Sequence, residues 1–247
     1  MPVRFILLVT FITACAVEDP AETTSSAELA GHRHDHSMLF DRDARPFGIP
    51  MERWGELVWK WIFRQPASVN PALDQTGADC GIDQEGPVWF LPSVIPNAPV
   101  FSAERTCTVP RHKALLVQTS SFFNDFPCPD PAFRPAPGQS LFGFLSDGAA
   151  AFIDTVDLLE LSIDGVPQHD LLDFRFASRD LFYFKGDLSL QTALDGCVTG
   201  RLQPAVTDGY LVMVKPLTPG NHTLVWHATD TFGMTGNTTL TYHLTVR

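Results

Sequence analysis

Two aspartates in a proline-rich stretch, Asp125 and Asp130, have functional groups that could catalyse a reaction. Glycoside hydrolysis needs only a pair of carboxyl groups at a suitable separation in space, one of them acting as the acid. We therefore take these two residues as the candidate catalytic groups of an extracellular hydrolase. Loop aspartates also stabilise turns without any catalytic role, and this interpretation stays open. The chain contains no G-x-S-x-G motif, no H-E-x-x-H motif and no P-loop.

Two groups of side chains carry the donor atoms of metal ligands. Three histidines alternate along the chain, so an extended backbone places their imidazoles on one side, as a Zn²⁺ or Cu²⁺ site requires. Three aspartates offer carboxylate oxygens within one glycine-containing loop, the ligands that Ca²⁺ prefers, without the spacing of an EF-hand. Solvated segments that bind no metal are the alternative in both cases. The residues are His32, His34 and His36 in the first group and Asp74, Asp79 and Asp83 in the second.

Aromatic side chains are the candidates for binding, because their flat apolar faces contact sugar rings and protein side chains. Two of the candidates lie on the second side of an expected helix, and three lie at the start of the proline-rich stretch. The chain has 19 phenylalanines, so most of them must belong to the core. The candidates are Trp59, Phe63, Phe122, Phe123 and Phe126.

Four cysteines follow the leader, an even number that predicts two disulfide bonds in an exported chain. Three pairings are possible. We favour Cys80 with Cys107 and Cys128 with Cys197, because the first bond then encloses the apolar run at residues 86–91. No C-x-x-C spacing occurs, which argues against a structural zinc site.

Residues 1–15 are organised like an export signal, with Arg4 followed by an apolar stretch and then by small residues. The apolar stretch is too short to span a bilayer. Its end resembles the bacterial lipobox, in which the cysteine, here Cys15, becomes the lipidated first residue of the mature chain. The same residues also fit the A-x-A cleavage site of a freely secreted protein. Both interpretations place the fold outside the cytosol, either anchored to the membrane by lipid in the cell envelope or secreted.

The composition divides the rest of the chain in two. Residues 16–46 are rich in Ala, Ser, Thr, Glu and Asp and predict a flexible tether. Residues 47–247 predict a single globular domain, since a chain with 45% hydrophobic residues is able to form a core. The formal net charge of −11 argues against nucleic acid as a partner.

A helix is expected at residues 51–65, between Pro50 and Pro66. Apolar residues follow the spacing of one buried face, and Trp59 and Phe63 fall nearly opposite that face. The helix is therefore either buried on both sides within its own domain, or free to dock a partner on its second side.

Alternating polarity predicts strands at residues 210–214, 223–228 and 239–246, and shorter apolar runs predict strands at 113–119, 158–163, 172–176 and 181–184. Ser146 or Asp147 is expected to cap a short helix that ends at Asp157. The fold class that follows is mainly β: an antiparallel β-sandwich with an N-terminal amphipathic helix and one short additional helix.

Two resemblances extend this expectation. The run at residues 216–224, followed by residues 228–230 and a threonine-rich final strand, resembles the last strands of bacterial immunoglobulin-like domains. This resemblance implies scaffolding or recognition and supplies no catalytic residues. The tryptophan-rich helix and residues 70–71, 74–80, 86–91 and 105–110 resemble a family of exported bacterial proteins and lipoproteins that brings no assigned activity.

We therefore expect a lipid-anchored or secreted binding or structural module of the cell envelope, which recognises a glycan or a protein partner. The alternative is an extracellular, glycosidase-like hydrolase that uses paired carboxylates.

Overall fold

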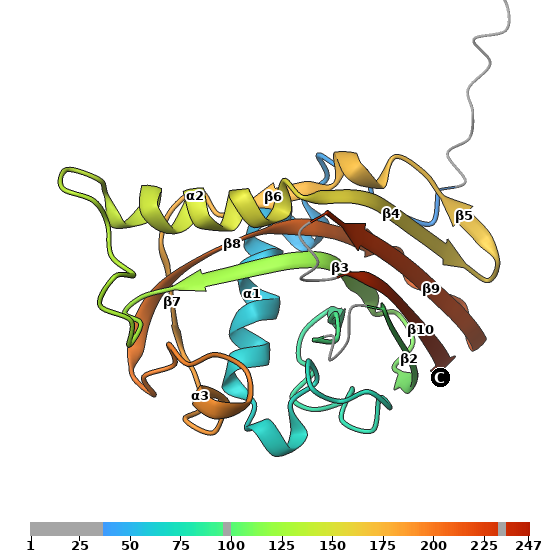
Figure 1. Cartoon of the computed structure of the whole chain (residues 1–247). Helices are drawn as coiled ribbons and strands as arrows, with labels where there is room; N and C mark the ends of the chain where they lie inside the picture. Colours follow the sequence, from blue (N-terminus) through green and yellow to red (C-terminus); the bar gives the residue numbers. More distant parts are fainter. Residues whose placement is uncertain (1–36, 96–99, 232–235) are drawn as a thin grey trace, which may run out of the picture. The chain divides into compact units, whose positions relative to one another are not determined.

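The computed structural model describes residues 37–95, 100–231 and 236–247, and within them the chain is mainly β (Figure 1). No helix of these residues is long and apolar enough to cross a membrane. Short 3-10 turns occur at Pro46–Gly48, Ala67–Val69 and Leu171–Asp173. The remaining elements are α1 (Met51–Arg64), β1 (Val88–Leu91), β2 (Val100–Val109), β3 (Ala114–Asp125), α2 (Leu141–Ile153), β4 (Val156–Ile163), β5 (Val166–Gln168), β6 (Arg175–Ala177), β7 (Phe182–Lys185), α3 (Leu190–Ala193), β8 (Leu202–Val214), β9 (Gly220–Asp230) and β10 (Asn237–Val246).

The strands form two sheets. In the first sheet β3 lies between β1 and β8, and both β6 and β7 pair with β8; the second sheet has the order β2-β10-β9-β4-β5. Most neighbouring strands are antiparallel, but β1 and β3 are parallel, as are β10 and β2. The expectation of purely antiparallel sheets is therefore wrong for these two pairs. The chain passes into the second sheet as β2 before it returns as β3, which allows β3 to run in the same direction as β1.

The main core lies between the two sheets. Alternate residues of β9 and β10, among them Trp226 and Tyr242, are fully buried there against Leu115 of β3 and Val212 of β8. This alternation is that of strands with one face in a core. A second core forms on the other face of the first sheet, where α1 packs Trp54 and Ile62 against the sheet.

Strand β1 ends where Pro92 follows Leu91, because proline cannot donate to a strand ladder. The segment after it is held elsewhere: the Pro92 carbonyl accepts hydrogen bonds from Arg105 and from the Tyr242 hydroxyl, and Val94 is buried in the main core. As a result β1 pairs with β3 only as far as Val117.

Residues 37–46, which the sequence analysis assigned to the tether, belong to the compact unit Ser37–Arg247. Leu39 is buried and forms a bridge with Val214, and the Phe40 amide donates to the Met213 carbonyl. Residues 38–40 therefore lie along the end of β8. The predicted signal peptide, the first part of the tether, and the candidates Cys15, His32, His34 and His36 lie outside the described residues.

The helix predicted at residues 146–157 begins earlier and ends earlier, as α2. The Ser140 hydroxyl, rather than that of Ser146, accepts the Gly143 amide and caps the helix. Beyond Ile153 the chain enters β4, where Val156 pairs with Asp230. A further short helix, α3, was not expected, so the prediction of one additional helix is also wrong.

The two disulfide bonds are Cys80–Cys107 and Cys128–Cys197, which confirms the favoured pairing. The first joins the loop before β1 to β2, and the second joins the loop after β3 to the loop after α3. The first bond thus connects a loop to a strand, and the second connects two loops to each other.

At Gly209 in β8 there is no room for a side chain next to β3, since a Cβ built there would lie 2.5 Å from the Cα of Ser121. We expect Gly209→Ala to lower the free energy of unfolding by about 2–3 kcal/mol, because backbone atoms cannot move away as a side chain can. Urea denaturation followed by tryptophan fluorescence measures this loss. Gly81→Ala is the matched control, because its Cβ would meet only Trp89 at 3.8 Å. Equal losses in the two variants would contradict this account of Gly209.

Candidate functional site

A cavity of about 570 Å³ lies beside β3, and it collects six of the seven catalytic and aromatic candidates that the sequence analysis named. Its walls come from α1, the segment after β1, β3, the loop after β3, α2 and the loop after α3. The lining residues include Trp59, Phe63, Ser93, Val94, Ile95, Gln118, Ser120, Ser121, Phe122, Phe123, Asn124, Asp125, Asp130, Phe133, Phe152, Leu194 and Asp195.

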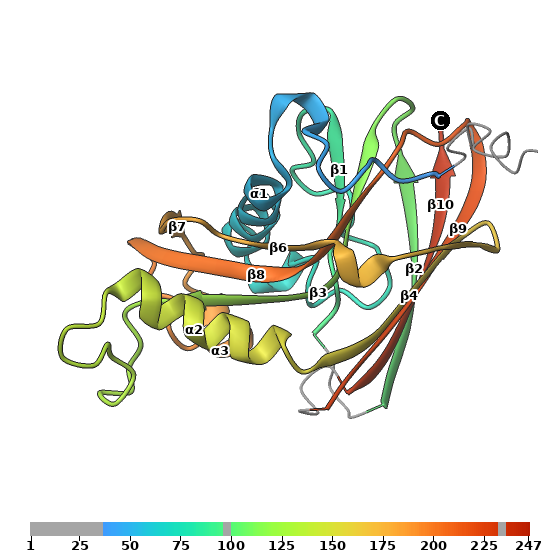
Figure 2. The same ribbon diagram turned by 90° about the horizontal axis from the view of Figure 1, so that it is seen from above.

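Strand β3 contributes to both sides of the cavity because successive side chains point to opposite faces of a strand. Phe122 stacks on Phe152 of α2, with ring centroids 4.4 Å apart. Phe123 packs on the other face against Phe63 of α1, at 4.3 Å. Figure 2 shows α1 and α2 on opposite sides of the β3–β8 pair. The edge of β3 therefore runs between two aromatic walls.

The aromatic wall on the α1 side is fixed mainly by ring contacts. Phe63 and Phe123 are buried and both contact Phe184 of β7 at 4.9 Å. Trp59 is half-buried, lies 5.3 Å from Phe123, and donates its indole N–H to the Ser121 hydroxyl at 2.9 Å. Trp59 is therefore held in place with one part of its ring free to meet a ligand.

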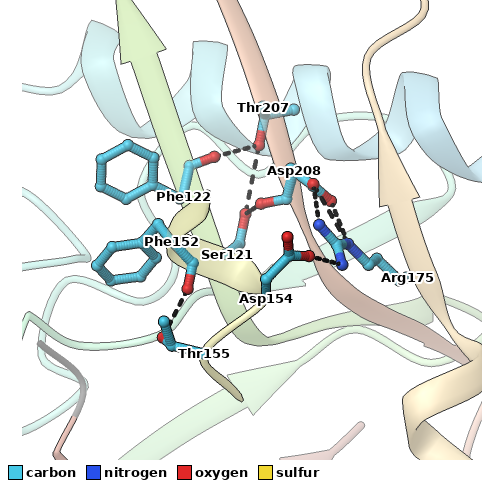
Figure 3. Close-up of polar contacts among 8 residues, drawn as sticks. All are labelled: Ser121, Phe122, Phe152, Asp154, Thr155, Arg175, Thr207 and Asp208. Atoms are coloured by element: carbon cyan, nitrogen blue, oxygen red, sulfur yellow. Dashed lines mark hydrogen bonds and ion pairs between the residues drawn. The ribbon is translucent and has the colours of Figure 1, made fainter. Parts of the chain in front are cut away.

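A polar network under the cavity wall orients Ser121 (Figure 3). Its hydroxyl contacts the Thr207 hydroxyl and the Asp208 carbonyl of β8. The Asp208 carboxylate accepts hydrogen bonds from Arg175 of β6, which also pairs with Asp154 after α2. The hydrogen bonds that Arg175 donates to Asp208, and then the one to Asp154, raise the pKa of Arg175 despite its partial burial. Arg175 thus ties β6 and the end of α2 to β8, the strand that pairs with the one carrying Ser121.

Asp125 lies at one end of the cavity as one member of a carboxyl pair with Asp195. Asp125 is only 2% exposed, and Gln203 donates to its Oδ2 at 2.6 Å. Burial, together with the charge and hydrogen bond of Asp195, raises the pKa of Asp125 to about 8. At neutral pH the pair therefore holds a proton, which the two carboxyl groups share in the hydrogen bond between them.

Two buried polar side chains lie nearer the other end. Gln118 and Ser120 are each 1% exposed, and neither the Gln118 amide nitrogen nor the Ser120 hydroxyl has a hydrogen-bond partner among the described residues. Buried polar groups without partners cost about 1–3 kcal/mol each, and they are uncommon in folded proteins.

Four of the five aromatic candidates line the cavity, and Phe126 does not. Phe126 packs beside Leu145 and Ala149 under α2. Asp130 lies on the rim, where its carboxylate accepts the Ala132 amide as a turn residue does. The structure thus brings both carboxylate candidates to one cavity but gives Asp125 a different partner, Asp195.

The calcium candidates do not form one ligand group in the described part of the chain. Burial would raise the pKa of Asp74, but hydrogen bonds from Asp79, Thr76 and Gly77 outweigh it and lower that pKa. Asp83 instead contacts Gln65 and Arg64. The Asp74 carboxylate is therefore occupied in shaping its own loop. One cluster of potential ligands occurs among the described residues, Asp125 with Cys128 and Cys197, but these cysteines form a disulfide and have no thiolate to offer.

Sequence reasoning missed Asp195, Gln118 and Ser120. Nothing near Asp195 in the sequence indicates that it meets Asp125, because only the fold brings together residues so far apart in the chain. The polar run at residues 118–121 inside an otherwise apolar strand was a usable signal, since buried strands are normally apolar throughout.

Comparisons with known proteins add little. No protein-family model matches the chain, and no curated protein matches it. The chain is similar to a solved structure described as "Structure of PbICP-C in complex with falcipain-2", at 15% sequence identity and a TM-score of 0.25, over 66% of this chain and 100% of that one. At this score the similarity carries no argument about fold or function.

The raised pKa of Asp125 predicts a pH dependence of stability. An unfolded aspartate loses its proton near pH 4, whereas folded Asp125 keeps its proton up to about pH 8. The unfolded state therefore binds fewer protons between these values, and the free energy of unfolding falls as pH rises, by up to about 1.4 kcal/mol per pH unit.

Urea denaturation across this pH range measures the slope. We expect Asp125→Asn to flatten it, because the amide stays neutral and retains a donor for Asp195. Asp130→Asn is the control on the same rim and leaves the slope unchanged. A wild-type slope that survives in Asp125→Asn would show that the proton lies elsewhere.

Proposed function

We propose that this protein is an extracytoplasmic binding module of the cell envelope, lipid-anchored or secreted, whose cavity takes an apolar group of a partner. The observation that carries the proposal is the combination, in one cavity, of aromatic walls and buried polar groups without partners, Gln118 and Ser120. Ligand sites are concave and mostly apolar, with a few polar groups that fix the orientation of the ligand.

The composition of the walls favours a protein partner over a glycan. Trp59, Phe63, Phe122 and Phe123 surround the cavity, and no lysine or arginine is among the lining residues that the structure describes. A hydroxyl-rich sugar enclosed here would lose more hydrogen bonds to water than the few polar groups return. An apolar side chain loses none.

The proposed location rests on the leader and on the disulfides. Two disulfide bonds are typical of a protein that folds in an oxidising compartment. Export through the signal at residues 1–15 and lipidation at Cys15 are part of the proposal. The immunoglobulin-like character of the C-terminal strands also belongs to it, supported by the antiparallel β9–β10 hairpin and its packing across the core on the first sheet.

The alternative, an extracellular hydrolase with paired carboxylates, would have to use Asp125 with Asp195. Glycosidases hold their two carboxyl groups about 5–10 Å apart so that the sugar fits between them. Asp125 and Asp195 are directly hydrogen-bonded, and Gln203 contacts the same group. This contact favours binding over glycoside hydrolysis.

The neutral fluorescent probe N-phenylnaphthylamine tests whether the cavity accepts an apolar group. We expect a saturable rise in probe fluorescence with the wild-type protein, and at least a roughly tenfold weaker response with Ser93→Trp, because the added indole fills the cavity. Ser102→Trp is the matched control, because the Ser102 side chain is exposed on β2 and outside the cavity lining, and we expect this variant to bind the probe as the wild type does. Equal binding by all three proteins would place the probe outside the cavity and contradict the proposal.

Intact-mass measurement of the mature protein from its native host tests the anchor. We expect the chain to begin at Cys15 and to carry acyl chains, and Cys15→Ser to release the protein from the membrane fraction. A mature chain that begins after Cys15 and carries no lipid would instead show a freely secreted protein. An uncleaved leader would contradict both forms of export.

A further inference from the structure

The cavity borders an edge of β3 beside which the described residues place no strand. On one side β3 pairs with β8 as far as Asp125, but on the other side its pairing with β1 stops at Val117. Among the described residues, no backbone hydrogen bond joins residues 118–125 to any segment other than β8. In an antiparallel ladder alternate residues direct their N–H and C=O groups away from the partner strand, so this edge offers unused donors and acceptors.

We propose that the occupant of the cavity is an extended polypeptide segment of another protein, which adds a strand to the edge of β3 at residues 118–125. This inference rests on the proposed binding function and names the class of partner. Strand addition of this kind derives affinity from main-chain hydrogen bonds and specificity from pockets that receive alternate side chains. Here the pocket is the aromatic cavity, and the strand segment is about 23 Å long.

The surroundings of this edge distinguish it from the outer edges of the second sheet. Strand β2 carries exposed Glu104 and Thr106 along its length, and β5 has only three residues, features that discourage pairing. The edge of β3 instead carries Phe122 and Phe123 and lies within the apolar cavity. The walls of the cavity therefore restrict which chains reach this edge, a task that charged side chains perform at other exposed edges.

The acidic side chains of the cavity favour a peptide that carries a basic residue. Among the described residues that line the cavity, the carboxylates Asp125, Asp130 and Asp195 are the ionisable side chains. Exposed Asp130 is free to attract a cation at the rim. We therefore expect the peptide to have apolar side chains at alternate positions and a lysine or arginine beyond them.

A library of random nonapeptides displayed on phage, selected against the full mature protein, tests the proposal. We expect enriched peptides to show alternating apolar residues followed by a basic residue. Hydrogen exchange with one synthetic enriched peptide should then slow at residues 118–125 of β3. Two versions of this peptide, N-methylated at the odd or at the even backbone amides, should differ in affinity. Methylation of the amides that point toward β3 should weaken binding roughly tenfold or more, and methylation of the other amides should change it little.

Variants locate the site independently. Ser120→Lys places a charge against the β3 edge and should weaken the peptide roughly tenfold or more. Val166→Lys, on the exposed edge of β5, is the matched control and should bind normally. Circular dichroism melting verifies that each variant is folded, and the exchange measurement on the wild type needs no variant.

Three outcomes would overturn the inference. The first is that no peptide is enriched in the selection. The second is that an enriched peptide leaves hydrogen exchange at residues 118–125 unchanged. The third is that hydrogen exchange at this edge slows with protein concentration alone, which would make a second copy of the chain the occupant. If N-phenylnaphthylamine enters the cavity in any of these cases, the binding function stands and only the peptide partner fails. If the probe also fails to enter, the proposed function fails with it.

Discussion

The pairing of β3 with β8 is the interaction on which the rest of the structure depends. It joins the core between the sheets to the core under α1, because residues on alternate faces of the two strands enter different clusters. Gly209 allows the strands to approach where the register shifts after Gln118. The same pair positions Ser121 and, through it, Trp59. A change at this contact therefore reaches the folding core and the cavity together.

The cavity exists because β1 is short. Had β1 continued beside β3 beyond Val117, its side chains would fill the space between α1 and α2. Pro92 ends the strand, and Arg105 and Tyr242 hold the following segment against the second sheet. The disulfide Cys128–Cys197 closes the far end by holding the loop with Asp195 near Asp125. The unpartnered polar atoms of Gln118 and Ser120 and the buried carboxyl group of Asp125 each lower the free energy of unfolding. Such losses of stability are common at binding sites.

Residues close together in the sequence were the most predictable. Strand alternation at β9 and β10 and the even number of cysteines depend on local pattern or on composition. Predictions that depended on distant neighbours were less accurate. The parallel pairing of β1 with β3 arises because the chain forms β2 in the second sheet between these two strands. The helix α2 begins after Ser140 because this residue caps it, although Ser146 and Asp147 are equally suitable cap residues by type.

The sequence by itself determined a β-rich domain with two disulfides, and it named the aromatic residues and carboxylates from which a site could form. Only the tertiary structure decided that Asp125 meets Asp195 rather than Asp130, that Phe126 lies outside the cavity, and that one edge of β3 lacks a partner strand within the described part of the chain. The physical reason is that a carboxyl pair and an unpaired edge are relations between segments far apart in the chain. Chain connectivity fixes these relations, while local propensity leaves them undetermined.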